Sequence, residues 1–313
     1  SFDYSSITGN VGHGRQDVHF LCSGDTRDSI HSNGIYTFLG QLLHQSVWEI
    51  EFITFSGVKI MKAGVLLGAA LLLVSASAIA DVSETEEMTF DVVAGARISL
   101  ENINGDIRIT GGPGRQVHMV AEKKAGKQEY LDELEVLVDA DDDYIRIETR
   151  HPKSEGGWFN WGKDSSGSIS YVLEVPADIN LDTISTVNGD VEISAVLGKV
   201  KAETVNGSLH AMGLEGDVNL ETVNGSVKAE FDVLGAGQRV SAEAVNGKIV
   251  LVVPADTSAR VQAETVNGSI NADDFGLKPE KGFVGRDLSG EIGGGDARIS
   301  LDTVNGSIRI SKK

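Results

Sequence analysis

Residues 218–229 read Val-Asn-Leu-Glu-Thr-Val-Asn-Gly-Ser-Val-Lys-Ala, and the central Val-Asn-Gly recurs through the second half of this 313-residue chain. Six copies end at Gly189, Gly207, Gly225, Gly247, Gly268 and Gly306. Successive asparagines of these copies are 18, 18, 22, 21 and 38 residues apart. Because self-similarity at about 20 residues is typical of solenoids, the sequence predicts a stack of similar coils.

Apolar residues alternate with polar ones on both sides of each Val-Asn-Gly. In one copy Val200 and Ala202 precede the corner and Leu209 follows it, while Lys201 and Glu203 stand between the apolar positions. A period of two residues is typical of a strand with one buried face. We therefore predict an all-β fold, a single-stranded parallel β-helix of about eight rungs, right-handed by preference.

Asn-Gly between two strands is also typical of a β-hairpin, so an antiparallel meander or sandwich is the alternative. Recurrence of the same side-chain sizes at the same offsets favours coils stacked about 4.8 Å apart. In that arrangement we expect each corner glycine to adopt φ > 0 and the asparagines to hydrogen-bond from rung to rung.

The predicted turn ladder contains one Asn-Gly pair per rung. Its members are Asn104, Gly105, Asn188, Gly189, Asn206, Gly207, Asn224, Gly225, Asn246, Gly247, Asn267, Gly268, Asn305 and Gly306. The 38-residue interval predicts a degenerate rung over residues 283–292, with Ser289-Gly290 at its corner and Phe283 and Ile292 pointing inward. Residues 307–313 are expected to form an exposed edge strand, protected from end-to-end stacking by two terminal lysines.

The chain divides into four predicted segments. Residues 181–313 hold the solenoid repeats, and residues 81–180 are expected to form N-terminal capping strands. Within the cap, residues 134–138 and 144–148 flank an acidic turn at 139–143 and predict a hairpin, whereas residues 151–167 predict a loop. Residues 61–80 are a predicted signal peptide, and residues 1–60 an upstream extension expected to be disordered.

The signal peptide is predicted from its three parts: Met61-Lys62, an apolar run to Val74, and an Ala-x-Ala cleavage site ending at Ala80. Met61 would then be the true start of the protein. The alternative is a signal anchor that leaves residues 1–60 in the cytoplasm. Cleavage after Ala80 predicts an exported chain in the periplasm or at the cell surface, without an integral membrane span. The signal anchor would also export the residues that follow it, but it would remain as one membrane span.

Charge and composition exclude several functions. The formal charge is −19, and removal of residues 1–80, with six acids and four bases, leaves −17. Because such a surface repels phosphate backbones, no nucleic-acid partner is expected. The one cysteine, Cys22, precedes the signal peptide, and the three later histidines occupy unrelated positions. We therefore expect no cofactor, no metal centre and no catalytic site.

The stretch "ISLENINGDIRI", the strand that ends in Val-Pro, the repeated "TVNGS" and the final "GEIGGGDARISLDTVNGSIRI" resemble a bacterial domain family of unknown function labelled "putative adhesin". The resemblance extends over residues 85–311. It implies an exported β-solenoid, and it brings no catalytic residues with it.

Two outward rows and one loop are candidate binding sites. Three residues before successive asparagines stand Glu203, Glu221, Glu243, Glu264 and Asp302. This row predicts a strip for divalent cations or a basic partner, or else a solvated face. The residue directly before each asparagine is apolar and should point outward, as a partner-binding stripe or under a covering loop. Trp158 and Trp161 would stack on sugar rings or anchor their loop.

These observations predict an exported, non-catalytic β-solenoid that presents a regular surface to glycans or other envelope polymers. Envelope or host glycans and proteins are its expected partners, and the sequence leaves the oligomeric state open. The alternatives are a structural envelope component without a ligand and a carbohydrate-active β-helix enzyme.

Overall fold

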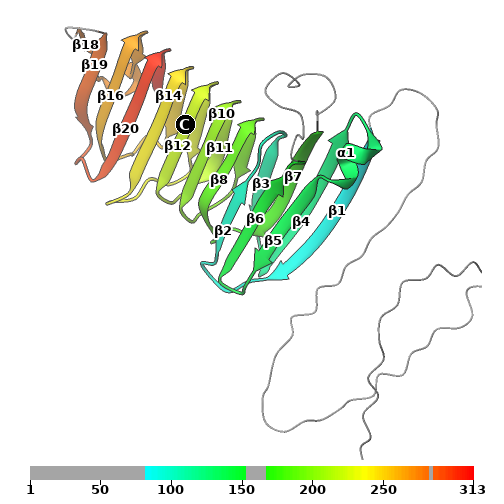
Figure 1. Cartoon of the computed structure of the whole chain (residues 1–313). Helices are drawn as coiled ribbons and strands as arrows, with labels where there is room; N and C mark the ends of the chain where they lie inside the picture. Colours follow the sequence, from blue (N-terminus) through cyan, green and yellow to red (C-terminus); the bar gives the residue numbers. More distant parts are fainter. Residues whose placement is uncertain (1–81, 153–166, 282–284) are drawn as a thin grey trace, which may run out of the picture. The chain divides into compact units, whose positions relative to one another are not determined.

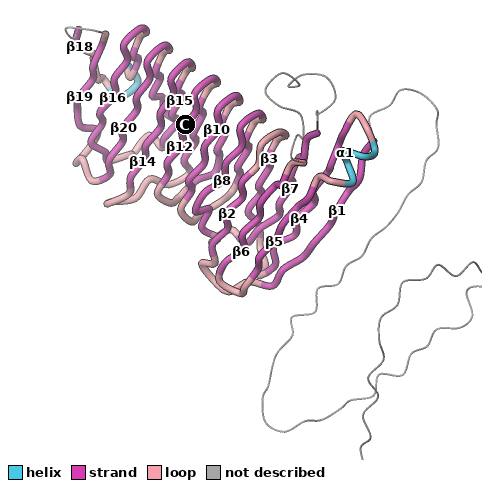
Figure 2. Tube along the Cα trace, in the orientation of Figure 1, coloured by secondary structure: helices cyan, strands magenta, loops and turns pink. Residues whose placement is uncertain are grey.

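The computed structural model describes residues 82–152, 167–281 and 285–313, which form a stack of paired β-strands (Figure 1). The predicted extension 1–60, the predicted signal peptide, Trp158, Trp161 and Phe283 lie outside the described residues. The tube in Figure 2 shows strands throughout the stack and short loops between them. Within this part of the chain no helix is long and apolar enough to cross a membrane.

Two sheets enclose the core, and each corner joins a strand of one sheet to a strand of the other. The ten-stranded sheet contains, in spatial order, β1 (Val82–Asp91), β4 (Gln116–Ala125), β7 (Gly167–Pro176), β3 (Ile107–Gly112), β9 (Val191–Ser194), β11 (Leu209–Leu214), β13 (Val227–Phe231), β15 (Ile249–Val253), β21 (Ile308–Lys312) and β17 (Ile270–Asn271).

The eleven-stranded sheet contains, in spatial order, β18 (Glu280–Lys281), β19 (Arg286–Ile292), β16 (Ala259–Asn267), β20 (Ala297–Asn305), β14 (Arg239–Asn246), β12 (Val218–Asn224), β10 (Val200–Asn206), β8 (Asn180–Asn188), β2 (Arg97–Glu101), β6 (Tyr144–Arg150) and β5 (Glu135–Ala140). Two short helices, α1 (Gln128–Asp132) and the 3-10 helix η1 (Asp273–Phe275), complete the described elements.

The repeats stack in parallel and in register. Val200 lies beside Val218, and Asn206 lies beside Asn224 on the neighbouring strand. The same parallel pairing joins β12 to β14 and β11 to β13. The predicted β-solenoid is confirmed, and the Asn-Gly strands do not form the alternative antiparallel meander. The predicted hairpin is also present, because β5 and β6 pair antiparallel around residues 141–143.

Spatial order departs from chain order at both ends of the stack. The C-terminal rung, β20–β21, lies between β14–β15 and β16–β17. At the other end, β2–β3 lies between β6–β7 and β8–β9. The expectation of an exposed C-terminal edge strand was therefore wrong, because β21 pairs with β15 on one side and β17 on the other.

The predicted degenerate rung at residues 283–292 is also wrong. In this region β19 pairs antiparallel with β16, with Ser289 beside Gln262 and Gly290 beside Val261. Ser289-Gly290 thus lies within a strand and does not form a corner. The segment covers the end of the eleven-stranded sheet and adds no coil to the solenoid.

Alternate side chains of both sheets fill a single apolar core. In β10 the side chains of Val200, Ala202 and Thr204 are buried, and in β11 those of Leu209 and Ala211. Removal of one valine or leucine side chain from water contributes about 1.5–3 kcal/mol to folding. Because every rung repeats this burial, the apolar core is continuous along the whole stack.

The corner asparagines form a continuous ladder of amide hydrogen bonds, as predicted. Nδ2 of Asn206 donates to Oδ1 of Asn188 at 2.9 Å, and Asn224 donates to Asn206 at 3.0 Å. The ladder follows spatial order, since Asn305 donates to Asn246 and Asn267 donates to Asn305. Asn188 donates to Asn104 at 2.7 Å, so the ladder includes all seven asparagines of the predicted set.

Close packing between rungs, and not a positive φ, requires glycine at most corners. Among the corner glycines only Gly105 has a positive φ, of 123°, so the expectation of φ > 0 at every corner was wrong. A Cβ atom added to Gly225 would overlap with the carbonyl oxygen of Gly207 on the neighbouring rung. The same overlap with a neighbouring corner backbone would arise at Gly189, Gly207, Gly247, Gly268 and Gly306.

A second ladder joins threonine hydroxyls to those glycine carbonyls. Thr204 Oγ1 donates to the carbonyl oxygen of Gly189 at 3.0 Å, and Thr222 donates to that of Gly207 at the same distance. The rung of Asn246 has Ala244 at this position and cannot make the bond. The corners are therefore held by asparagine amides outside and threonine hydroxyls beneath them.

Candidate functional site

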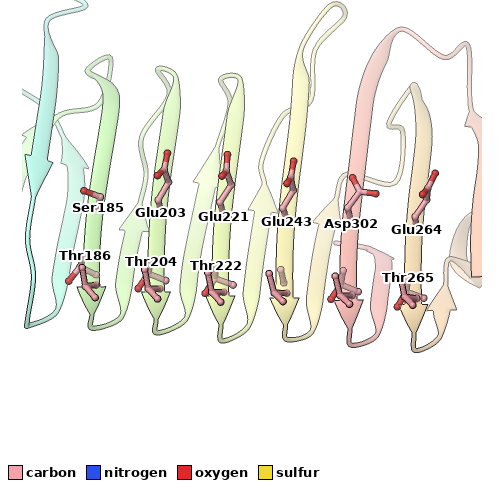
Figure 3. Close-up of a pocket in the computed structure, with 18 of the residues that line it drawn as sticks. Ser185, Thr186, Glu203, Thr204, Glu221, Thr222, Glu243, Glu264, Thr265 and Asp302 are labelled. Carbon is pink, nitrogen blue, oxygen red and sulfur yellow. The ribbon is translucent and has the colours of Figure 1, made fainter. Parts of the chain in front are cut away.

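The candidate site lies on the outer face of the eleven-stranded sheet, next to the corners. Glu203 is in register with Glu221, Glu221 with Glu243, and Glu243 with Asp302. Figure 3 shows these carboxylates side by side on successive strands, with Asp302 between Glu243 and Glu264. These five acids, which the sequence places at equivalent offsets, thus form one straight line, in which Asp302 precedes Glu264 although it follows Glu264 in the chain.

The complete row is longer than the six acids and one serine that the sequence places three residues before an Asn-Gly pair, which are Glu101, Ser185, Glu203, Glu221, Glu243, Glu264 and Asp302. We call it the acid row, and in spatial order it consists of Glu148, Glu101, Ser185, Glu203, Glu221, Glu243, Asp302, Glu264 and Asp287. Sequence reasoning missed Glu148 and Asp287. Neither stands three residues before an Asn-Gly pair, and Asp287 joins the row only because β19 pairs antiparallel with β16.

Basic partners are unevenly distributed along the acid row. Lys201 Nζ lies 2.7 Å from a carboxylate oxygen of Glu203, and this hydrogen bond raises the pKa of Lys201. Glu221 accepts a hydrogen bond from the Asn219 amide at 2.8 Å. Among the described residues no ion pair reaches Glu221, Glu243, Asp302 or Glu264. From Glu221 to Glu264 the row therefore has no directly paired cation among these residues, although Lys201 also attracts Glu221 from the neighbouring strand.

Glu243 shows the electrostatic consequence. Partial desolvation, and then the charges of Glu221 and Asp302 on either side, raise the pKa of the Glu243 carboxyl above its ordinary value of 4.5. Like charges on neighbouring strands disfavour the ionised form of the group between them. A cationic group placed at this point would relieve that repulsion.

An apolar row runs beside the acid row, two residues nearer the corners. We call it the apolar stripe, and in spatial order it consists of Ile103, Val187, Val205, Val223, Val245, Val304 and Val266. Each of these side chains is 39–43% exposed. The expectation that a loop or the corner itself covers them is wrong for the described part of the chain.

The acid row from Ser185 to Asp287 and the apolar stripe from Val187 to Val266 together line an open groove of about 840 Å³. The threonines of the hydroxyl ladder also line it, and Figure 3 shows Thr204 and Thr222 nearer the corners than Glu203 and Glu221. The groove extends from Ser185 on β8 to Arg286 and Asp287 on β19. The fold thus converts a one-dimensional repeat into a long groove with one acidic and one apolar wall.

Metal binding has less support than the sequence suggests. No group of three or more His, Cys, Asp or Glu side chains within residues 82–152, 167–281 and 285–313 is arranged to hold a metal ion. This holds for the acid row and for the acidic turn between β5 and β6 alike. The aromatic candidates Trp158 and Trp161 lie outside the described residues, so their role stays a prediction.

Several solved structures resemble the chain. A putative cell adhesion protein from Clostridium sporogenes is 16% identical, with a TM-score of 0.43, and the match covers 74% of this chain and all of that one. A putative adhesin from Bacteroides fragilis is 14% identical, with a TM-score of 0.37, and 74% and 97% of the two chains are covered. A putative lipid binding protein from Parabacteroides distasonis is 10% identical, with a TM-score of 0.21, over 74% and 96%.

No curated protein matches the sequence. The sequence profile of one family, described as Toastrack DUF4097, matches residues 83–311 and so includes every described strand from β2 to β20. This domain has no assigned function, and its fold is the β-solenoid that the described residues form. The chain therefore belongs to the Toastrack DUF4097 family.

Proposed function

We propose that this protein is an exported, non-catalytic binding protein of the bacterial envelope, and that the groove on its eleven-stranded sheet holds the ligand. The observation that carries the proposal is the apolar stripe. Seven aliphatic side chains stand in one line, each about two-fifths exposed. Contiguous apolar patches are rare on soluble proteins and mark interaction sites when polar residues border them, as the acid row does here.

The regular spacing favours an elongated partner. Stacked strands repeat at about 4.8 Å, so equivalent side chains recur at that interval along the groove. A linear polymer, such as an envelope glycan or a polypeptide, can make the same contact at each repeat. Many weak contacts at fixed intervals add up without any single deep pocket.

A carbohydrate-active enzyme is the second candidate, and the raised pKa of Glu243 between two carboxylates is the observation that favours it. The geometry supports it less well. Glycosidases place their two carboxyl groups on opposite sides of the scissile bond. The carboxylates of the acid row from Glu203 to Glu264 project from one sheet face, in one line (Figure 3). The remaining candidate is a structural envelope component without a ligand.

Co-sedimentation with insoluble envelope polysaccharides and cell-wall fragments tests the proposal. The groove variant is the double substitution Val223→Thr and Val245→Thr, which keeps β-branched side chains and adds hydroxyls. The matched control is Val172→Thr with Val233→Thr, because both valines are exposed, at 41% and 52%, and line no part of the groove.

We expect the unmodified protein and the control to sediment with at least one polymer and the groove variant to remain in the supernatant. Equal sedimentation of all three proteins would show that the polymer binds outside the groove. Release of soluble sugars from the polymer would support the enzyme, and the absence of both binding and turnover would support the structural component.

A further inference from the structure

We propose that the partner of the groove is a basic amphipathic α-helix, which lies along the stack with its cationic side chains on the acid row and its apolar side chains on the apolar stripe. The inference rests on the proposed function, because it names the chemical class of ligand for the same groove. Four features of the described residues support it: two adjacent rows, their spacing, the length of the groove and the position of its basic residues.

The two walls require a ligand with two chemistries side by side. Val223 and Val245 offer aliphatic surface, and the carboxylates of Glu221 and Glu243 stand two residues away on the same face. The two positions are separated by about 7 Å along a strand. A neutral apolar partner would bury the carboxylates without compensation, and a purely cationic one would leave the stripe exposed. A partner with parallel cationic and apolar rows satisfies both walls.

The spacing along the groove fits a helix better than a strand. Rungs recur at about 4.8 Å, whereas one turn of an α-helix advances about 5.4 Å and same-face residues of a β-strand about 6.6–6.8 Å. Over four rungs the mismatch between the turns of the helix and the rungs adds up to only about 2–3 Å, which flexible lysine side chains accommodate. An extended strand departs by about 7 Å over the same distance, so its charges would lose register.

Basic residues of the protein itself mark where the cationic row should lie. Lys201 already neutralises Glu203 on β10, and Arg286 lines the opposite end of the groove on β19. Between them, Glu221, Glu243, Asp302 and Glu264 occupy four adjacent strands and have no ion pair among the described residues. A helix of about four turns would place one cationic side chain over each of the four carboxylates.

The test uses the whole chain and three synthetic peptides of equal length. The first is an 18-residue peptide designed as a helix with lysines along one row and leucines along the adjacent row. The second has the same residues in an order that mixes the two rows, and the third replaces lysine by glutamate. Fluorescence anisotropy gives the dissociation constants at low and at physiological salt.

The acid-row variant is the triple substitution Glu221→Gln, Glu243→Gln and Glu264→Gln. Its matched control is Glu84→Gln, Glu129→Gln and Glu174→Gln, because these three carboxylates are exposed and lie outside the groove. Both variants change the net charge equally. We expect the acid-row variant to bind the first peptide about tenfold more weakly, and the control less than about twofold.

We also expect Val223→Thr with Val245→Thr to weaken binding several-fold, the mixed peptide to bind more weakly than the ordered one, and the glutamate peptide not to bind. Circular dichroism confirms that each variant is folded. Equal losses in both triple variants, or equal binding of the ordered and mixed peptides, would show attraction to net charge alone and would overturn the proposal.

Two further outcomes would also overturn it, and only the first would leave the proposed function standing. One is retention of the protein on an envelope polymer through the groove valines while no helical peptide binds. The other is a concentration-dependent dimer, seen by sedimentation velocity and abolished by the valine substitutions, which would make a second copy of this chain the occupant.

Discussion

Asn305 donates a hydrogen bond from Nδ2 to Oδ1 of Asn246 at 2.8 Å, although 59 residues separate the two in the sequence. Asn267, which precedes Asn305 in the chain, lies beyond it in the ladder and donates to it. The amide ladder therefore connects rungs that are neighbours in space only. It fastens the inserted C-terminal rung to both of its neighbours.

Removal of one amide from this ladder should weaken the C-terminal part of the stack. Asn305→Ala deletes the bond to Asn246 and the bond from Asn267. The corner is exposed, so water partly replaces both bonds, and we expect a loss of about 1–2 kcal/mol in the free energy of unfolding. Urea denaturation followed by circular dichroism measures it. Asn219→Ala, which removes a side chain that among the described residues hydrogen-bonds to Glu221 alone, should cost less than half as much.

Addition of the missing hydroxyl at position 244 should stabilise the protein. In five other rungs a threonine donates to a corner glycine carbonyl, as Thr303 does to that of Gly247 at 3.0 Å. Ala244→Thr would give the carbonyl of Gly225 the same partner, worth about 0.5–1.5 kcal/mol in thermal or urea unfolding. Ala244→Val has the same shape without the hydroxyl, and an equal gain from it would refute the hydrogen-bond explanation.

A methyl group at a corner glycine should be far more harmful than one elsewhere in a strand. Gly225→Ala brings its Cβ onto the carbonyl oxygen of Gly207, so the two rungs must separate locally. We expect a loss of about 3 kcal/mol or more in stability. The control is Gly112→Ala in β3, where no atom lies within 4 Å of an added Cβ and φ is not positive. Comparable melting temperatures for the two variants would contradict the close-packing explanation.

Glu243 should make the stability of the protein depend on pH. Its pKa is raised in the folded state by desolvation and by Glu221 and Asp302, so the folded protein holds this proton more tightly than the unfolded chain. The resulting stability is fully present below pH 4.5, the ordinary pKa, and is lost as the pH rises through the higher folded value. We expect Glu243→Gln to be more stable than the unmodified protein at pH 7, with no such difference at pH 3.

Urea unfolding at the two pH values measures this effect. Glu203→Gln is the control from the same row, because Glu203 is compensated by Lys201 at 2.7 Å and its removal should not stabilise the protein at neutral pH. A gain from both substitutions would indicate relief of general repulsion along the acid row rather than a special environment at Glu243.

The repeat predicted the register of the solenoid but not the order of its rungs. Val218, Val240 and Ile299 occupy the same inward offset, and they stack on one another as expected. Because these inward residues are interchangeable, the sequence does not predict the spatial order of the rungs: Ile299 fits beside Val240 as well as beside Val261. Interchangeable interior residues carry no information about which rung is the neighbour.

Alternation predicted correctly that the valines before the asparagines point outward, as Val223 and Val245 do. It failed at residues 283–292, because a period of two is common to parallel and antiparallel strands and Ser289-Gly290 resembles a corner. The corner glycines were predicted for the wrong reason. Glycine is needed at position 225 because the carbonyl of Gly207 on the neighbouring rung leaves no space for a side chain. That contact exists only in the assembled stack, so the sequence of one repeat cannot predict it.

The inserted rung constrains the order in which the stack can fold. A polypeptide is made from its amino terminus, so β16–β17 exists before β20–β21 does, yet the finished molecule holds the later pair between β14–β15 and the earlier one. If β16–β17 packed directly against β14–β15 first, that contact would have to open before β20–β21 could take its place between them. The stack therefore cannot assemble rung by rung in chain order, because β20–β21 separates two rungs that both precede it in the sequence.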